Sequence, residues 1–254
     1  MPIDRVEFLG VSFDRLSQQQ VIERLGEIRA ESPFGYVTTP NVDHVVRLNR
    51  EGSESAIKAA YANADLCVCD SRVLAFLARL RGIRLPVVTG SDLTAALFGS
   101  VLRHGDRVAV VGGSDGGDLV RRLSGRYPHI DFVHYCPPMG LRKDVAAQAA
   151  AAAFITEAKA RFTFLAVGSP QQELIAAQVK GAIGIGLCVG AALEFLTGDQ
   201  IRAPRALRRA GLEWAYRLAS DPRRLWRRYL VEGPRVFLLA WRWRAPTAGG
   251  GRRA

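Results

Sequence analysis

The regular alternation of short apolar runs with longer stretches of helical period constrains the fold more than any other feature of the sequence. The runs are rich in Val, Ile, Phe and Cys, are bounded by Gly, Pro or Asp, and several are apolar on both faces. Strands inside a parallel sheet have this pattern, because helices cover both of their faces. The runs predict strands at Phe34–Thr38, Leu66–Val68, Arg107–Val111, Asp131–Tyr135, Phe162–Val167 and Gly184–Val189.

The stretches between the runs predict the helices that cover this sheet. After one N-terminal strand, they span Ser17–Ala30, Val42–Asn49, Ala56–Ala62, Ser71–Arg81, Ser91–His104, Gly117–Arg126, Lys143–Lys159 and Gln171–Lys180. The alternation indicates an α/β fold with a Rossmann-like, mostly parallel sheet and flanking helices. Ligands of such sheets bind beyond the carboxyl ends of the strands, so we expect the functional groups in the segments that follow the strands.

The positive charge of the chain is concentrated at its C-terminal end. Residues 201–254 contain 14 Arg, no Lys and three acidic residues, which leaves a net charge of +11, equal to that of the whole chain. The preceding residues are therefore formally neutral. We predict a Rossmann-like domain over residues 1–199 and a basic helical appendage over residues 200–254. Such an appendage is suited to contact with the phosphates of lipid, nucleotide or nucleic acid.

The N-terminal segment and the apolar runs indicate where the protein works. The first residues lack the basic start and unbroken apolar stretch of a signal peptide, so we expect a cytoplasmic protein. The longest apolar runs, such as Phe162–Val167 and Val236–Trp241, are far shorter than the roughly 20 residues of a membrane-spanning helix.

The four cysteines, at positions 67, 69, 136 and 188, are predicted to be reduced thiols. A zinc site at Cys67 and Cys69 would need two further ligands at finger-like spacing, and the histidines form no such pair. We therefore favour buried, hydrophobic cysteines and predict no metal site.

Two segments that follow predicted strands contain candidate functional groups. Thr39 and Asn41 come after one strand, and Asp70 comes after the next. A carboxylate at Asp70 could accept a proton from the hydroxyl group of a substrate. Alternatively, these residues cap the helices that follow, since Thr, Asn and Asp are frequent N-caps.

A glycine-rich turn that contains Gly112 and Gly113 lies between the strand at Arg107–Val111 and the next helix. Backbone amides in such a turn can bind a phosphate or diphosphate at the helix N-terminus. The turn departs from the dinucleotide fingerprint, because Ser114 stands in place of the middle glycine. A nucleotide site and a simple tight turn are equally consistent with this pattern.

A second turn, at Gly168, leads into Gln172 and Glu173. Their side chains could bind sugar hydroxyls or the edge of a uracil. Alternatively, the segment is only the start of a helix with Pro170 in its first turn.

The C-terminal segment places arginines beside aromatic residues at helical spacing. Arg224 lies three residues before Arg227 and four before Arg228, which predicts that the three lie on one helix face. Such a cluster can bind a diphosphate through bidentate hydrogen bonds. The segment Val236–Arg244 mixes bulky apolar residues with arginines, which favours a helix in the membrane interface. The alternative is an ordinary solvated, arginine-rich helix.

An ordered set of short motifs extends over most of the chain. The motifs are Phe8-Leu9-Gly10-Val11 with Phe13-Asp14, Thr39-Pro40-Asn41, Ala64-Asp65 leading to Asp70, Thr89-Gly90-Ser91-Asp92-Leu93, Pro137-Pro138, Gly168-Ser169-Pro170-Gln171-Gln172-Glu173, Val189-Gly190-Ala191-Ala192, Arg202-Ala203-Pro204 and Gly211-Leu212-Glu213-Trp214. In this order the set resembles the WecG/TagA/CpsF glycosyltransferases, glycosyltransferase family 26.

The resemblance implies transfer of a hexose or N-acetylhexosamine-type sugar from a UDP-sugar to a polyprenyl-diphosphate-linked sugar, in the synthesis of an exopolysaccharide or other surface polymer. It also implies roles for individual residues. The residue that matches Asp70 is the family's proposed general base. The other matching site residues are Thr39, Asn41 and Gln172 in the pocket and Arg217, Arg224 and Arg227 in the C-terminal appendage. In the family, this appendage closes over the site when the enzyme meets the inner face of the cell membrane.

The mechanism expected from these residues is a single displacement that inverts the anomeric carbon, with Asp70 as the base. The chain has no D-x-D motif for a divalent metal, so we expect arginines to stabilise the leaving diphosphate, without a cofactor. Three departures from the family pattern concern the donor: Ser71 replaces a glycine, Leu193-Glu194 replaces Phe-Asp, and Val87 replaces a common arginine. Arg84 is a candidate replacement for that arginine.

Two other functions are consistent with parts of the sequence. An arginine-rich, aromatic tail can bind nucleic acid, although no nucleic-acid fold signature accompanies it, and we predict no such partner. A nucleotide-dependent oxidoreductase would use a Rossmann-like sheet, although the glycine fingerprint is imperfect. Besides a UDP-sugar, a polyprenyl-diphosphate-linked acceptor and an anionic membrane surface, the expected partners include a second copy of the chain.

Overall fold

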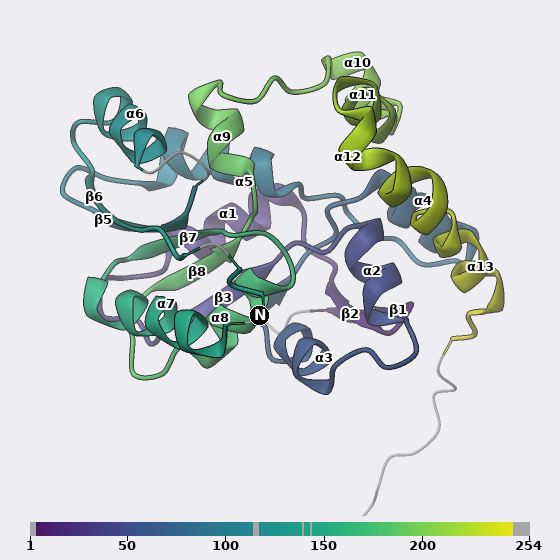
Figure 1. The fold of residues 1–254 in the computed structure, drawn as a ribbon. Helices are drawn as coiled ribbons and strands as arrows, with labels where there is room; N and C mark the ends of the chain where they lie inside the picture. The colour runs from purple at the N-terminus through teal and green to yellow at the C-terminus, as the bar shows by residue number, and fades with distance from the viewer. Residues whose placement is uncertain (1–3, 114–116, 139, 143, 246–254) are drawn as a thin grey trace, which may run out of the picture.

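The centre of the molecule is a six-stranded sheet in which every pairing is parallel (Figure 1). The computed structural model describes residues 4–113, 117–138, 140–142 and 144–245. In the order β4-β3-β8-β7-β5-β6, the strands are β4 (Leu66–Cys67), β3 (Gly35–Thr38), β8 (Ile185–Cys188), β7 (Phe162–Ala166), β5 (Arg107–Gly112) and β6 (Asp131–Tyr135). The predicted α/β, Rossmann-like class and all six strands are confirmed.

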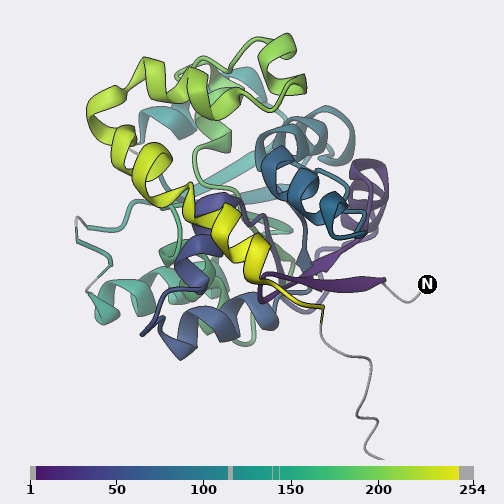
Figure 2. The same cartoon turned by 90° about the vertical axis from the view of Figure 1, so that its right-hand side faces the viewer.

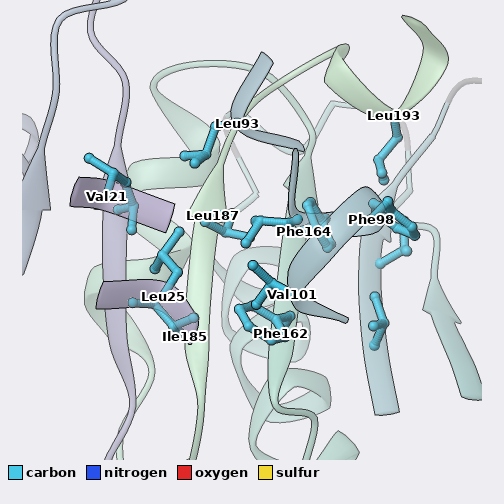
Figure 3. Close-up of a cluster of buried hydrophobic side chains, with 14 of the residues drawn as sticks. Val21, Leu25, Leu93, Phe98, Val101, Phe162, Phe164, Ile185, Leu187 and Leu193 are labelled. Carbon is cyan, nitrogen blue, oxygen red and sulfur yellow. The ribbon is translucent and has the colours of Figure 1, made fainter. Parts of the chain in front are cut away.

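Helices cover both faces of the sheet, as the doubly apolar strands require. One face is covered by α1 (Gln18–Gly26), α5 (Gly90–Ala96) with the π-helix η1 (Leu97–Val101), α6 (Asp118–Arg126) and α9 (Ala192–Thr197). The other is covered by α7 (Val145–Ala158) and α8 (Gln171–Gln178). Phe162, Phe164 and Leu187 point from the strands into the first of these layers, where they pack against Leu93 and Phe98 (Figure 3).

A second core lies beside the β4 edge of the sheet. It is formed by α2 (Val42–Leu48), α3 (Ser55–Ala62), α4 (Arg72–Leu80) and a hairpin of β1 (Arg5–Phe8) and β2 (Val11–Asp14). The sequence predicted one N-terminal strand here, and the hairpin was missed. Leu9 and Gly10 both have positive φ, as a two-residue hairpin turn requires, and leucine is an unusual residue at such a position.

Two helices end three or more residues before their predicted limits. Helix α1 ends at Gly26, because the carbonyl groups of Gly26 and Ile28 accept hydrogen bonds from the buried Arg161 guanidinium. The helix predicted at Ser91–His104 ends at Val101, and its second half is the π-helix η1. The end of α1 depends on a long-range contact and the π-helix on a change of backbone hydrogen bonding, and the spacing of apolar residues predicts neither.

The C-terminal helices run diagonally across the molecule (Figure 2). They are α10 (Arg205–Arg209), α11 (Glu213–Ser220), α12 (Pro222–Trp226), the π-helix η2 (Arg227–Glu232) and α13 (Arg235–Arg242). Helix α13 packs against α2 and α4, and its Val236 and Ala240 are buried. Arg81 donates hydrogen bonds of 2.6 Å to the carbonyl groups of Ala240 and Trp241 and so holds the C-terminal end of α13. The domain boundary near residue 200 stays a prediction.

Candidate active site

A cavity of about 390 Å³ lies where the C-terminal helices cross the loops that follow β3 and β4. Both parts of the chain line it. The loops and helix starts after the strands contribute Asn41, Asp43, Asp70, Thr89 and Asp92, and the C-terminal part contributes Arg202, Arg208, Trp214, Arg217, Arg228 and Phe237. The side near the strands therefore contributes three of the four lining carboxylates, and the C-terminal part contributes Glu213, four arginines and aromatic rings.

Asp70 lies at this cavity because the chain after β4 stays extended beside its neighbours. Its backbone N–H donates to the carbonyl group of Pro40 at 3.0 Å, and its Oδ2 accepts from the backbone N–H of Gly90 at 3.3 Å. The alternative role as a helix cap belongs to Ser71, whose Oγ accepts from the backbone N–H of Leu74 at 3.2 Å. The carboxyl group of Asp70 is thus not used in capping.

The electrostatic environment of Asp70 raises its pKa to about 7. Burial is the main cause, because it disfavours the charged form, and the negative charges of Glu213 and Asp92 act in the same direction. The hydrogen bond from Gly90 and the charge of Arg217 oppose the shift. A carboxyl group with a pKa near neutrality is suited to general acid–base catalysis.

Thr39 and Asn41 occupy neighbouring positions with different roles. The Oδ1 of Asn41 accepts from the backbone N–H of Asp43 at 3.0 Å, so Asn41 caps α2 and also lines the cavity. Thr39 is buried, and its hydroxyl donates to the carbonyl group of Cys188 at 3.0 Å. Thr39 therefore joins β3 to β8 and is not among the residues that line the cavity.

Gln172 and Glu173 are buried beneath the carboxyl ends of the strands rather than at the cavity. The Oε1 of Gln172 accepts from the backbone N–H of Gly190 at 3.0 Å, and its Nε2 donates to Glu173 at 2.8 Å. Burial raises the pKa of the Glu173 carboxyl group, with hydrogen bonds from Gln172 and Ser169 opposing it. As they stand, both side chains hold other parts of the protein together.

The sequence interpretation missed the polar network around this pair. The hydroxyl of Tyr61 lies 3.0 Å from Nδ1 of His44 and 3.2 Å from Oγ of Ser169, which also accepts from Arg47. Burial lowers the pKa of His44 and raises that of Tyr61, so both rings are neutral near pH 7. The contacts join α2 and α3 to the turn before α8, which is more than 100 residues further along the chain.

The two predicted nucleotide turns follow β5 and β7, which are neighbouring strands of the sheet. Gly112 has φ +101°, and an added Cβ would lie 2.7 Å from Val167 Cγ1 and 2.8 Å from the Ala166 carbonyl oxygen, so close packing alone requires glycine there. Gly113 and Gly168 also have positive φ. The middle of the predicted phosphate loop, residues 114–116, lies outside the described residues.

The arginines predicted for the site separate into two groups. Arg217 lines the cavity, where its Nη2 donates to Glu213 at 2.7 Å and its guanidinium lies 5.1 Å from the ring centre of Phe195. Arg224 and Arg227 point to solvent, with side chains 71% and 75% exposed. Arg228, by contrast, lines the cavity.

The chain changes from α-helix to π-helix at Arg227. A π-helix has hydrogen bonds from i to i+5, so the α-helical spacing on which the prediction of one shared face rests does not continue past this residue. Arg202 and Arg208 also line the cavity, although the sequence interpretation gave them no role. Val87 lines it as well, and Arg84 is not among the lining residues.

Residues 6–249 match the model of the glycosyl transferase WecG/TagA/CpsF family. The chain belongs to the WecG/TagA/CpsF glycosyltransferase family. Among its relatives are the N-acetylglucosaminyldiphosphoundecaprenol N-acetyl-beta-D-mannosaminyltransferases of Staphylococcus aureus strains MRSA252 and MW2. Each is 24% identical to this chain over 231 and 233 residues, respectively, or 88% of this chain and 87% of the relative. The resemblance drawn from the ordered motifs is confirmed.

The cavity of this glycosyltransferase is rich in arginine and carboxylate groups and contains no thiol or imidazole ligand among its lining residues. Among the described residues, no group of three or more His, Cys, Asp or Glu side chains is arranged to bind a metal ion. The four cysteines are free thiols, as predicted, and only Cys136 is exposed.

The outer surface of the glycosyltransferase has an apolar band on α13 and α4. Leu238 and Trp241 of α13 are exposed, Trp241 to 75%, and α4 presents Phe76 and Leu80. The two helices contact each other, and Figure 2 shows both on the side that faces the viewer. In the part of the chain that the structure describes, no helix is long and apolar enough to cross a membrane.

Proposed function

We propose that the protein is an inverting glycosyltransferase that transfers a hexose or N-acetylhexosamine-type sugar from a UDP-sugar to N-acetylglucosamine linked to a polyprenyl diphosphate. The names of the relatives support this acceptor and favour N-acetylmannosamine as the transferred sugar. The observation that carries the proposal is the position of Asp70, with a pKa of about 7, in a cavity that also contains four arginines of the C-terminal part. The polymer that results belongs to the cell surface.

In this reaction Asp70 is the general base. Its carboxylate accepts the proton of an acceptor hydroxyl as the hydroxyl oxygen forms a bond to the anomeric carbon of the donor. The bond from that carbon to the diphosphate oxygen breaks, and the nucleoside diphosphate leaves from the opposite face with the electron pair. The anomeric configuration is therefore inverted, and the proton stays on Asp70 until product release.

The negative charge that develops on the leaving diphosphate has cationic partners in the cavity. The charge of Arg217 lowers the pKa of Asp70, and the charge of Asp70 raises the pKa of Arg217, as expected for two groups that lie near each other. Fixed cations in a partly buried site stabilise a developing anion without reorganisation. We therefore propose that arginines, rather than a divalent metal, stabilise the leaving group. The site is supported by buried polar side chains that do not line the cavity, namely Thr39, Gln172 and Glu173. The candidates for nucleotide contacts remain Gly112, Gly113 and Gly168.

We further propose that the enzyme binds the inner face of the cell membrane through the apolar band of α13 and α4. Arg242 follows the exposed Trp241, and the C-terminal region accounts for the whole net charge of the chain. Apolar side chains flanked by cations bind anionic bilayers through both burial and charge. The polyprenyl part of the acceptor lies in the same bilayer, so this orientation brings the cavity to its substrate.

A donor panel tests the proposed reaction. Radiolabelled UDP-N-acetylmannosamine, UDP-N-acetylglucosamine, UDP-glucose and UDP-galactose are each incubated with polyprenyl-diphosphate N-acetylglucosamine in detergent and EDTA. We expect label to pass from one donor to the lipid, and an inverted linkage in the product by NMR. If folded protein transfers label from none of these donors, with or without added Mg²⁺ or Mn²⁺, the proposed function is wrong.

A further inference from the structure

Two arginines of the cavity have buried N–H groups that make no hydrogen bond to any described residue. They are Nε and Nη2 of Arg202, and Nε of Arg228. Each guanidinium lies beside one carboxylate from the first turn of a helix, α5 for Arg202 and α2 for Arg228. Arg202 Nη1 donates to Asp92 Oδ1 at 2.7 Å, and Arg228 Nη2 lies 3.5 Å from Asp43 Oδ2. Both side chains line the cavity that contains Asp70.

We infer that Arg202 and Arg228 bind the diphosphate group of a substrate, an inference that rests on the proposed function. A buried charged donor without a partner costs free energy, and a ligand acceptor removes that cost. Guanidinium groups present a planar fork of N–H groups that matches phosphate oxygens. Asp92 positions the fork of Arg202 through its hydrogen bond, which reduces the conformational freedom lost on binding, while Asp43 is shared between Arg228 and Arg47.

The turn at the start of α5 connects the proposed base to this anion site. The backbone N–H of Gly90 donates to Asp70, and two residues later Asp92 holds Arg202. Thr89 caps the same helix and donates to Oδ2 of Asp92 at 2.7 Å, so the carboxylate is fixed on both sides. A diphosphate on Arg202 would therefore lie on the same rigid turn that positions Asp70.

The charge balance at Asp92 agrees with a permanent ion pair. Burial alone would raise the pKa of Asp92, but hydrogen bonds from Arg202 and Thr89 and the charges of Arg202 and Arg208 lower it overall. Asp92 is thus ionised at neutral pH and keeps Arg202 in place. One carboxylate shared by two arginines leaves net positive charge at the cavity wall, which favours an anionic ligand.

The diphosphate could belong to the nucleotide donor or to the lipid-linked acceptor, and calorimetric binding separates the two. UDP and N-acetylglucosamine linked to a short-chain prenyl diphosphate are titrated separately into the full chain, without metal. Loss of a charge-assisted hydrogen bond weakens binding by roughly 10- to 100-fold, so we expect R202Q and R228Q each to weaken at least one ligand by that factor. The ligand that is weakened identifies the source of the diphosphate.

Arg107 provides the matched control, because it also pairs with one aspartate but lies at the amino end of β5, away from the cavity. R107Q should bind both ligands as the wild type does. R202K keeps the charge but not the fork and should recover part of the affinity. D92N should weaken binding less than R202Q, and the double variant should bind no more weakly than R202Q, because Asp92 acts through Arg202.

The outcomes distinguish this inference from the proposed function. If the wild type binds either ligand and R202Q and R228Q bind it within twofold of the wild type, the inference is wrong while the proposed function stands. If the wild type binds neither ligand, both are wrong. Urea unfolding of each variant separates lost affinity from lost structure. Should R202Q fail to fold, R202K and D92N must still show a several-fold loss at unchanged stability, and wild-type affinity in both would overturn the inference.

Discussion

Replacement of Asp70 by asparagine tests the base directly, because the two side chains have nearly the same shape and only one accepts a proton. With a pKa of about 7 for Asp70, kcat/KM of the wild type should rise about tenfold per pH unit below pH 7 and level off above it. Loss of a general base lowers the rate by roughly 10²- to 10⁴-fold. D70N should show this loss at pH 8, and its residual activity should no longer rise with pH.

The same substitution has a calculable effect on stability. The pKa of Asp70 is raised from 3.8 to about 7 by folding, so the folded state binds this proton more tightly than the unfolded state. The resulting stability is fully present below the unfolded pKa and is lost as pH rises through the folded pKa. At about 1.4 kcal/mol per pH unit, the raised pKa of Asp70 costs at most roughly 4 kcal/mol of stability at pH 8 and roughly 1.5 kcal/mol at pH 5, relative to a pH at which both states are protonated.

D70N does not ionise and should therefore be more stable than the wild type, with an advantage that grows by about 2.5 kcal/mol at most between pH 5 and pH 8. Urea unfolding at the two pH values measures the difference. D131N is the control for the rate, because Asp131 is exposed at the amino end of β6 and its replacement should leave the rate unchanged. The reasoning is refuted if D70N works within threefold of the wild-type rate, or if the wild-type rate is constant between pH 5.5 and pH 8.

Four further substitutions test the membrane face and the core. L238S and W241S remove exposed apolar side chains of α13 and should each weaken sedimentation with vesicles that contain anionic lipid by about tenfold or more, while unchanged binding would argue against this face. F164A removes a fully buried ring between the sheet and the helices, so it should lower the free energy of unfolding in urea by about 3–5 kcal/mol. A loss below 1 kcal/mol would contradict the packing of Phe164 in this core. G112A places a Cβ against Val167 at a residue with positive φ, so it should lower the free energy of unfolding by roughly 1–3 kcal/mol in the same assay. If G112A is as stable as the wild type, β5 and β7 are not as closely packed at this residue as the structure shows.

The parallel sheet could be predicted because its signal is local. Strands such as Phe162–Ala166 are buried on both faces, and the sequence shows this as an unbroken apolar run. The position of Asp70 could be predicted for the same reason, since a residue that follows a buried parallel strand must lie at the carboxyl edge of the sheet. Charge asymmetry predicts a separate C-terminal region, and its boundary near residue 200 stays a prediction.

The arrangement of the arginines could not be predicted, because it depends on long-range contacts. The π-helix η2 begins at Arg227, and Arg228 rather than Arg224 or Arg227 lines the cavity. Arg202 reaches the site only because Asp92, 110 residues earlier in the chain, accepts its hydrogen bond. Gln172 and Glu173 looked like ligand-binding residues, and only the fold shows that their partners are Gly190 and each other.

The central claim is that the C-terminal helices complete an active site whose base lies at the edge of the parallel sheet. The most direct measurement is the single-turnover rate of sugar transfer by the wild type and by full-length R217Q, in EDTA and over a range of pH. Arg217 lines the cavity and its charge lowers the pKa of Asp70. The account predicts a loss of about 10²- to 10³-fold in rate and an acidic limb of the pH profile shifted to higher pH in R217Q. An equal rate with an unshifted pH profile would contradict it.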